Sequence, residues 1–173
     1  MRHPYNAIGY FGLVGHFHLV QRLISRLPQE FNSPTEYYQT LDNYVVAIEK
    51  IHSMKDWAIV EQIAAKEELN DTLNKLDDWH ICRDIAVISK HGKISSPSRQ
   101  GPYFIVASHP TSPGGKHEFW YQNNQRKIER KLHDALWHLI RTWEKFLEAK
   151  GYSKQQLAPP SNPEYRFPNM VPM

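Results

Sequence analysis

The stretch that decides the fold lies near the end of the chain, where residues 128–146 read IERKLHDALWHLIRTWEKF. Its apolar residues recur at intervals of three or four, the period that places side chains on one stripe of an α-helix. They are Ile128, Leu132, Leu136, Leu139, Trp143 and Phe146. The pattern predicts an amphipathic helix over residues 125–150 that stops at Gly151.

Two helices are predicted in the first third of the chain. Residues 10–27 carry an apolar stripe of the same period, which ends before Pro28. Ser33 then precedes a proline, and Glu36 follows it by three residues. This is the pattern of a helical N-terminus with a capping box, so it predicts a second helix over residues 34–51.

A third helical stretch is predicted from Met54 to His91. Ser53 and Asp56 have the spacing of another capping box, which favours a new helix at this point. The apolar stripe then makes a five-residue step from Ala64 to Leu69, and this step predicts a kink or break near residues 70–71.

Residues 93–125 have a different character. Prolines and glycines interrupt them, and two aromatic, β-prone runs lie at residues 103–107 and 119–121. They predict a two-stranded hairpin, which must pack on the helices because two strands alone are marginal in water. The predicted fold is therefore all-α. It is an antiparallel bundle of four to five helices over residues 1–151, with a β-hairpin inserted before the last helix.

The remaining sequence predicts a tail and a soluble setting. Residues 152–173 contain five of the twelve prolines and no periodicity, so they are expected to be extended or disordered. No apolar run of the chain reaches the 18 residues of a membrane-spanning helix. The single cysteine, Cys82, permits no disulfide within the chain. Together these features favour a cytoplasmic protein with no membrane partner.

Charge is unevenly distributed along the sequence. Residues 1–87 contain 8 basic and 12 acidic side chains, whereas residues 88–131 contain 8 basic and 2 acidic ones. A local excess of positive charge attracts phosphates, although it is also compatible with a solvated surface that pairs with the acidic half. The predicted RNA-binding residues in or beside this region are Lys90, Lys93, Lys116, Arg126, Lys127 and Arg130.

Residues 77–91, DDWHICRDIAVISKH, are the densest in reactive side chains. On a helix, His80, Asp84, His91 and Asp77 fall within about 60° of one another, with an arginine and a lysine beside them. Three interpretations are open. The face is solvated and its charges pair with each other, or it binds a divalent metal, or it cleaves RNA. No metal motif or phosphate-binding loop is present, so no metal and no cofactor is predicted.

The third interpretation also follows from a resemblance. The arginine, polar residue and downstream histidine on a helix of a small bundle resemble the signature of the HEPN superfamily of all-α prokaryotic proteins. Here Arg83 is followed by Asp84, and seven residues separate Arg83 from His91, one more than the longest spacing of the family pattern. A second pair, Arg126 and His133, has a spacing of six.

The resemblance implies a metal-independent endoribonuclease of the toxin or phage-defence type. In such a site the ribose 2′-OH attacks its own phosphate, and two protomers of a homodimer each supply half the site. It implies that Arg83 stabilises charge, that His91 is the acid or base, and that Asp84 or His80 orients His91. The alternative is a non-enzymatic interaction protein that dimerises or docks on a protein partner through the hairpin and the tail. Trp120 and Tyr121 of the hairpin are candidates to stack on bases.

Overall fold

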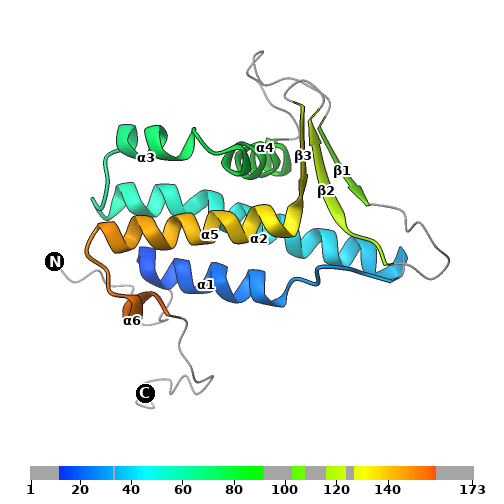
Figure 1. Cartoon of the computed structure of the whole chain (residues 1–173), viewed down its shortest axis with the longest axis horizontal. Coiled ribbons are helices and arrows are strands. Elements are labelled where there is room, and N and C mark those ends of the chain that lie inside the picture. The colour runs from blue at the N-terminus through cyan, green and yellow to red at the C-terminus, as the bar shows by residue number, and fades with distance from the viewer. Residues whose placement is uncertain (1–11, 33, 92–102, 108–115, 124–126, 159–173) are drawn as a thin grey trace, which may run out of the picture.

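The computed structural model describes residues 12–32, 34–91, 103–107, 116–123 and 127–158. Along these segments, four helices are followed by three strands and then by two more helices (Figure 1). The helices are α1 (Leu13–Arg26), α2 (Pro34–Val60), α3 (Lys66–Leu73), α4 (Asp77–His91), α5 (Leu132–Ala149) and α6 (Lys154–Leu157). The strands are β1 (Tyr103–Ala107), β2 (Phe119–Asn123) and β3 (Ile128–Lys131).

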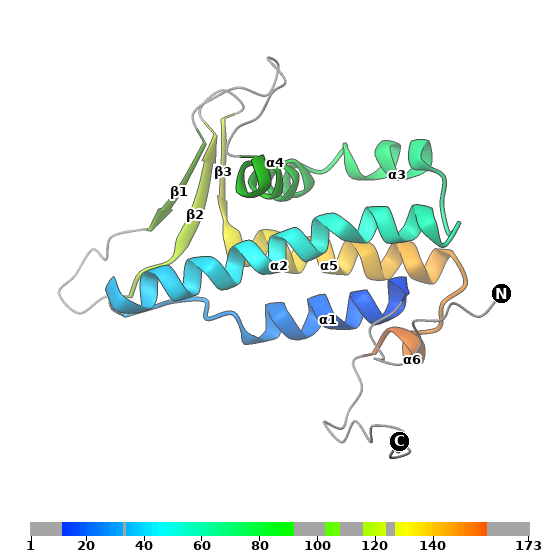
Figure 2. The same cartoon turned by 180° about the vertical axis from the view of Figure 1, so that it is seen from behind.

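The predicted fold class, a helical bundle with a hairpin before the last long helix, is confirmed. Helices α1, α2 and α5 run side by side along the long axis of the molecule, and α4 is seen nearly end-on because it crosses them (Figure 1). The sheet stands beside α4, above the start of α5, and the view from behind shows the same arrangement (Figure 2). No helix within the described segments is long and apolar enough to cross a membrane.

The apolar stripes of the helices meet in one core. Phe17 of α1, Ile48 of α2 and Leu139 of α5 are completely buried. The largest side chains in this core belong to Trp79 of α4 and Trp143 of α5, which are each 1% exposed. Burying side chains of this size contributes most of the free energy that holds the bundle together.

The predicted helix start at Ser53 is wrong, because α2 continues through this position to Val60. Ser53 Oγ donates a hydrogen bond to the carbonyl oxygen of Lys50 at 2.9 Å and also contacts His16 Nε2 of α1. A serine inside a helix can satisfy its hydroxyl on a carbonyl one turn earlier. Ser53 therefore contacts α1 from within α2 and does not cap a helix. Ser33, of the other predicted capping box, lies outside the described residues.

The predicted helix from Met54 to His91 is three elements. The predicted kink or break near residues 70–71 is misplaced, because α3 continues through these residues and the helical stretch is interrupted at residues 61–65 and 74–76. Helix α2 ends in a turn in which Gln62 adopts a φ of 58°, and the Ile63 and Gln62 amides donate to the carbonyls of Ala58 and Ile59. This is a Schellman motif, in which glycine usually takes the position of Gln62. Because this position is not a glycine, the sequence contains no clear indication that α2 ends here.

The predicted hairpin is confirmed, and a third strand extends it. Strands β1 and β2 pair antiparallel, with Ile105 opposite Tyr121, and β3 pairs with the other edge of β2. The segment Ile128–Lys131, expected as the start of the last helix, forms this third strand, so α5 begins only at Leu132. The apolar residue Ile128 reaches the core from a strand instead of from a helix.

Part of the predicted extended tail is ordered. Residues 154–157 form α6, and Ser153 and Gln156 make a reciprocal capping box at its start. Leu157 is completely buried, which anchors α6 against α1. The prediction of an extended segment over residues 152–173 is therefore wrong for its first part, and residues 159–173 lie outside the described segments.

Two glycines with positive φ offer a matched test of the start of α1. Gly12 has a φ of 90° and a ψ of 162°, and a Cβ built on it lies 2.9 Å from Glu61 Oε1, which accepts a hydrogen bond from the Leu13 amide. Gly151 has a φ of 95°, but its Cβ meets nothing within 4 Å in the described structure. We expect Gly151→Ala to lower the free energy of unfolding by about 1 kcal/mol and Gly12→Ala by about 2–3 kcal/mol.

Chemical denaturation of the two variants measures this difference. Both substitutions introduce backbone strain, whereas Gly12→Ala also displaces the Glu61 carboxylate that caps α1. Equal losses of stability in the two variants would contradict a capping role for Glu61.

Candidate functional site

An open cleft of about 750 Å³ lies where the start of α4, the strand β3 and helix α5 meet. Its volume is within the range of ligand-binding sites of small molecules. Acidic and basic side chains line it, together with an aliphatic patch formed by Leu76 and Ile128. The lining residues are Lys75, Leu76, Asp77, Asp78, Lys127, Ile128, Glu129, Arg130 and His138.

The carboxylate of Asp78 connects two other side chains that line the cleft. Asp78 is 5% exposed, so its charge requires partners. Arg130 of β3 donates from Nε to Oδ1 at 3.1 Å and from its terminal nitrogen to Oδ2 at 3.4 Å. His138 of α5 donates from Nδ1 to Oδ2 at 2.5 Å. One buried carboxylate thus joins an arginine and a histidine that come from different elements.

This arrangement fixes the orientation of the His138 ring. Because an ionised carboxylate only accepts hydrogen bonds, Nδ1 of His138 carries the proton that points to Asp78. The other ring nitrogen, Nε2, is then free to accept or return a proton. The side chains of His138 and Arg130 are 50% and 45% exposed, so both reach solvent in the cleft. A carboxylate that orients an imidazole in this way is the usual support of a general base.

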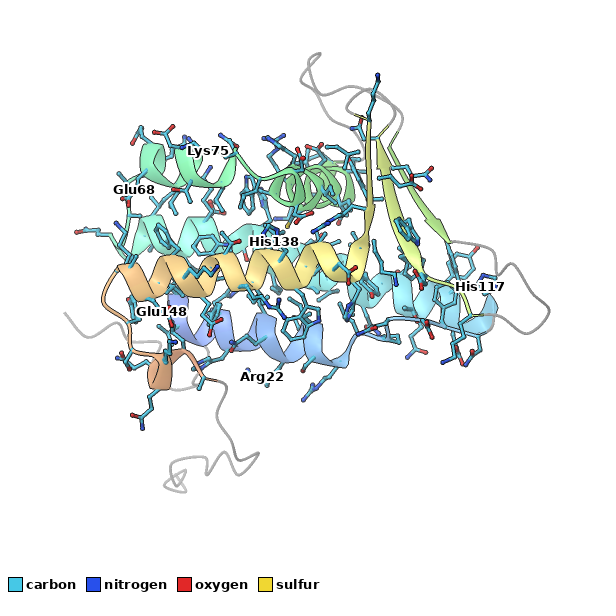
Figure 3. All side chains as sticks on the ribbon, viewed as in Figure 1. Arg22, Glu68, Lys75, His117, His138 and Glu148 are labelled. Carbon is cyan, nitrogen blue, oxygen red and sulfur yellow. The ribbon has the colours of Figure 1, made fainter. Side chains whose placement is uncertain are left out.

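Two lysines complete the positive side of the cleft. Lys75 lies in the connection between α3 and α4, and Lys127 directly precedes β3. Figure 3 labels Lys75 and, on α5, His138. Both lysines are exposed, and within the described structure neither makes an ion pair. Lys127 has a φ of 53°, a left-handed conformation that is rare for a side chain of this type. Such strain often accompanies a functional position.

The predicted catalytic residues of α4 do not share one solvated face. Asp84 is 1% exposed and pairs with Arg83 at 3.3 Å. His80 Nε2 lies 2.9 Å from the carbonyl oxygen of Asn74, so it caps α3 and does not orient His91. His91 is the last residue of α4 and is exposed. The prediction of a single solvated face fails because α4 packs on both α2 and α5, and the buried arc of the helix therefore extends to Asp84.

Of the predicted RNA-binding residues, Lys127 and Arg130 lie in the cleft. Lys116 instead pairs with Glu30 at 3.1 Å, and Lys90 is exposed near the end of α4. Lys93 and Arg126 lie outside the described residues. The described cations are therefore divided between the cleft and other surfaces, and they do not form one continuous patch.

The histidine of the second Arg/His pair, His133, is not placed to act as an acid or base. His133 is 5% exposed, and its Nε2 accepts a hydrogen bond from Trp137 Nε1 at 3.2 Å. Burial lowers the pKa of His133, which favours the neutral ring. His133 is thus a packed residue of α5.

The remaining reactive groups have structural roles. Burial raises the pKa of the Cys82 thiol, which is completely buried, so a thiolate nucleophile is disfavoured. His16 lies beside Ser53, but its Nε2 points to the Lys50 carbonyl oxygen at 2.8 Å and donates to it, so it cannot activate the serine. Within the described segments, no group of three histidine, cysteine or acidic side chains has the geometry of a metal site.

Sequence reasoning did not select Asp78, His138 or Lys75 as site residues. The contacts of Asp78 with Arg130 and His138 join positions that are 52 and 60 residues apart in the chain. Sequence motifs with fixed spacing do not relate positions this far apart. In the sequence of α5, nothing distinguishes His138 from an ordinary surface residue. A comparison of the chain with models of protein families, with curated proteins and with solved structures finds no match in any of the three.

Proposed function

We propose that the cleft binds RNA and cleaves it with His138 as the acid and base and Arg130 as the stabiliser of phosphate charge. The observation that carries the proposal is the shared carboxylate of Asp78, which holds both side chains at the mouth of the cleft. Lys75 and Lys127 supply further positive charge for the phosphates on either side of the cleaved bond.

The reaction follows from these positions. Nε2 of His138 takes the proton of a ribose 2′-OH, and the 2′-oxygen attacks the adjacent phosphorus atom. Arg130 stabilises the negative charge that develops on the non-bridging oxygens. The bond from phosphorus to the 5′-oxygen of the next nucleotide then breaks, and the imidazolium returns its proton to that oxygen. The products are a 2′,3′-cyclic phosphate and a free 5′-OH.

This proposal keeps the chemistry expected from the HEPN resemblance and assigns it to another pair of residues. An arginine and a histidine are still the working groups, and no metal takes part in a step. Since Arg130 and His138 both belong to one protomer, the proposed site does not require the homodimer that the resemblance implies. A homodimer stays a prediction, as does a setting in toxin or defence systems.

The direct experiment is incubation of a mixed structured RNA with the purified protein in the presence of EDTA. We expect cleavage that leaves 2′,3′-cyclic phosphate ends, which differ from the ends of metal-dependent hydrolysis. Cleavage that EDTA abolishes would contradict the proposed mechanism. A folded protein that neither cleaves nor binds RNA would contradict the whole proposal.

Lys127 permits a test that separates binding from folding. Glycine relieves the left-handed backbone at this position, so we expect Lys127→Gly to leave the melting temperature unchanged or to raise it. The same variant loses one phosphate contact, so its affinity for RNA falls. The slope of the logarithm of affinity against the logarithm of salt concentration decreases in magnitude by about one. Gln62→Gly is the matched control, because Gln62 has a φ of 58° but does not line the cleft.

The alternative, an interaction protein that docks through its hairpin, is favoured by one observation. Tyr38 near the start of α2 is 72% exposed, and its ring meets the ring of Tyr37, which contacts Phe119 of the hairpin. Trp120 is half-buried, whereas Tyr121 is 2% exposed and cannot stack on a base. A docking protein would lose partner binding in Tyr38→Ala and keep it in variants of His138.

A further inference from the structure

We propose that the cleft binds an unpaired nucleotide with a preference for guanine, and that Asp77 reads the base. This inference rests on the proposed function, since it concerns the RNA that reaches His138 and Arg130. It is carried by the carboxylates of the cleft and by its aliphatic patch.

The three carboxylates of the cleft have different surroundings. Asp78 is occupied by Arg130 and His138, and Glu129 Oε1 accepts a hydrogen bond from Gln122 Nε2 at 3.1 Å on the neighbouring strand. Asp77 is exposed, and within the described structure no hydrogen bond or ion pair joins it to another side chain. Asp77 is therefore the carboxylate that is available to a ligand.

A free carboxylate in a phosphate-binding cleft requires an explanation, because it repels the phosphates that the lysines and Arg130 attract. At the first residue of α4 the helix dipole already favours a carboxylate, and RNA gains from Asp77 only where it offers hydrogen-bond donors. Among the four bases of RNA, guanine alone presents two adjacent donors, N1–H and the 2-amino group, on one edge. They match the two oxygens of a carboxylate, and a paired contact of this kind gives strong discrimination between bases.

The aliphatic patch supplies a surface for the base. Leu76 directly precedes Asp77, and Ile128 faces the cleft from β3. Both side chains are half-buried and pack against the core, so they are held in place. A base that lies on this patch beside Asp77 must be unstacked and unpaired, because its hydrogen-bonding edge faces the protein. A cleft of about 750 Å³ suits a nucleotide of a single strand.

Binding of fluorescent RNA nonamers tests the inference. Each nonamer consists of uridine with one central guanosine, inosine or adenosine, where inosine lacks only the 2-amino group of guanosine. We expect the wild-type protein to bind the guanosine nonamer about 10-fold more tightly than the other two. Asp77→Asn removes this preference, so we expect the variant to bind the guanosine, inosine and adenosine nonamers with equal affinity.

Glu67→Gln is the matched control, because Glu67 is also an exposed acid in the first turn of a helix but does not line the cleft. It keeps the preference for guanosine, whereas a preference lost in both variants would overturn the role of Asp77. Equal affinities of the wild-type protein for all three nonamers would overturn the inference and leave the proposed function in place. Binding of none of them, by a folded protein, would overturn the proposed function itself.

Discussion

Replacement of His138 by alanine is expected to lower the rate of RNA cleavage by about 10²–10⁴-fold, the usual contribution of a general acid or base. His138 is half exposed on α5, but its removal takes one of two partners from the buried Asp78 carboxylate, so we expect the variant to fold with a moderately lower melting temperature. The measurement is a single-turnover cleavage assay at a protein concentration that saturates the RNA. The affinity for RNA should change by much less than the rate.

His91→Ala is the matched control for this experiment. His91 is an exposed histidine at the end of α4, and it is the acid or base that the resemblance to HEPN proteins implies. If His91→Ala abolishes cleavage and His138→Ala does not, the site belongs to α4 and the assignment of the reaction to the cleft is wrong. Asp78→Asn adds a third test, because an asparagine no longer favours the proton on Nδ1 of His138.

The sequence was sufficient to predict the parts of the fold that depend on local periodicity. The stripes of α1 and α5 continue over several turns, and Gly151 marks the end of α5 clearly. Each of these signals lies within one segment and concerns side chains that face the same core. For this reason the helical bundle and the position of the hairpin could be predicted before the tertiary structure was known.

Boundaries that depend on tertiary contacts could not be predicted in the same way. Residues Ile128–Lys131 have the periodicity of a helix but form β3, where Lys131 pairs with Glu118 and Arg130 with Asp78. Pairing with β2 and these two ion pairs outweigh the weak preference of four residues for a helix. The end of α2 could not be predicted either. The Schellman motif usually has glycine at the position with positive φ, and here that position is Gln62.

The candidate site was predicted only in part, because its members come from distant segments. Arg130 and Lys127 were selected from the charge excess of residues 88–131, and both line the cleft. The residue that pairs with Arg130, Asp78, is not among the residues predicted for the site. A buried carboxylate is recognised by its burial and its partners, and neither property is visible in a single sequence.

One ring of the sheet packs against the start of α2 and the segment before it, and its removal should have the largest effect on stability. Phe119 of β2 is 3% exposed. Its ring lies 4.8 Å from the ring of Phe31, 5.3 Å from that of Tyr37 and 5.5 Å from that of Tyr44. Phe119→Ala removes these aromatic contacts and leaves a cavity, so we expect the free energy of unfolding to fall by about 3–5 kcal/mol.

Trp120→Ala is the matched control, because Trp120 is the next residue of the same strand and its side chain points to the other face of the sheet. It is half-buried and donates from Nε1 to Glu118 at 3.2 Å, so we expect its replacement to reduce stability by about 1 kcal/mol. Urea denaturation of both variants measures the difference. Similar losses in the two variants would mean that the sheet is not held to α2 through Phe119. Because Arg130 reaches Asp78 from β3 of the same sheet, Phe119→Ala should also weaken the binding of RNA in the cleft.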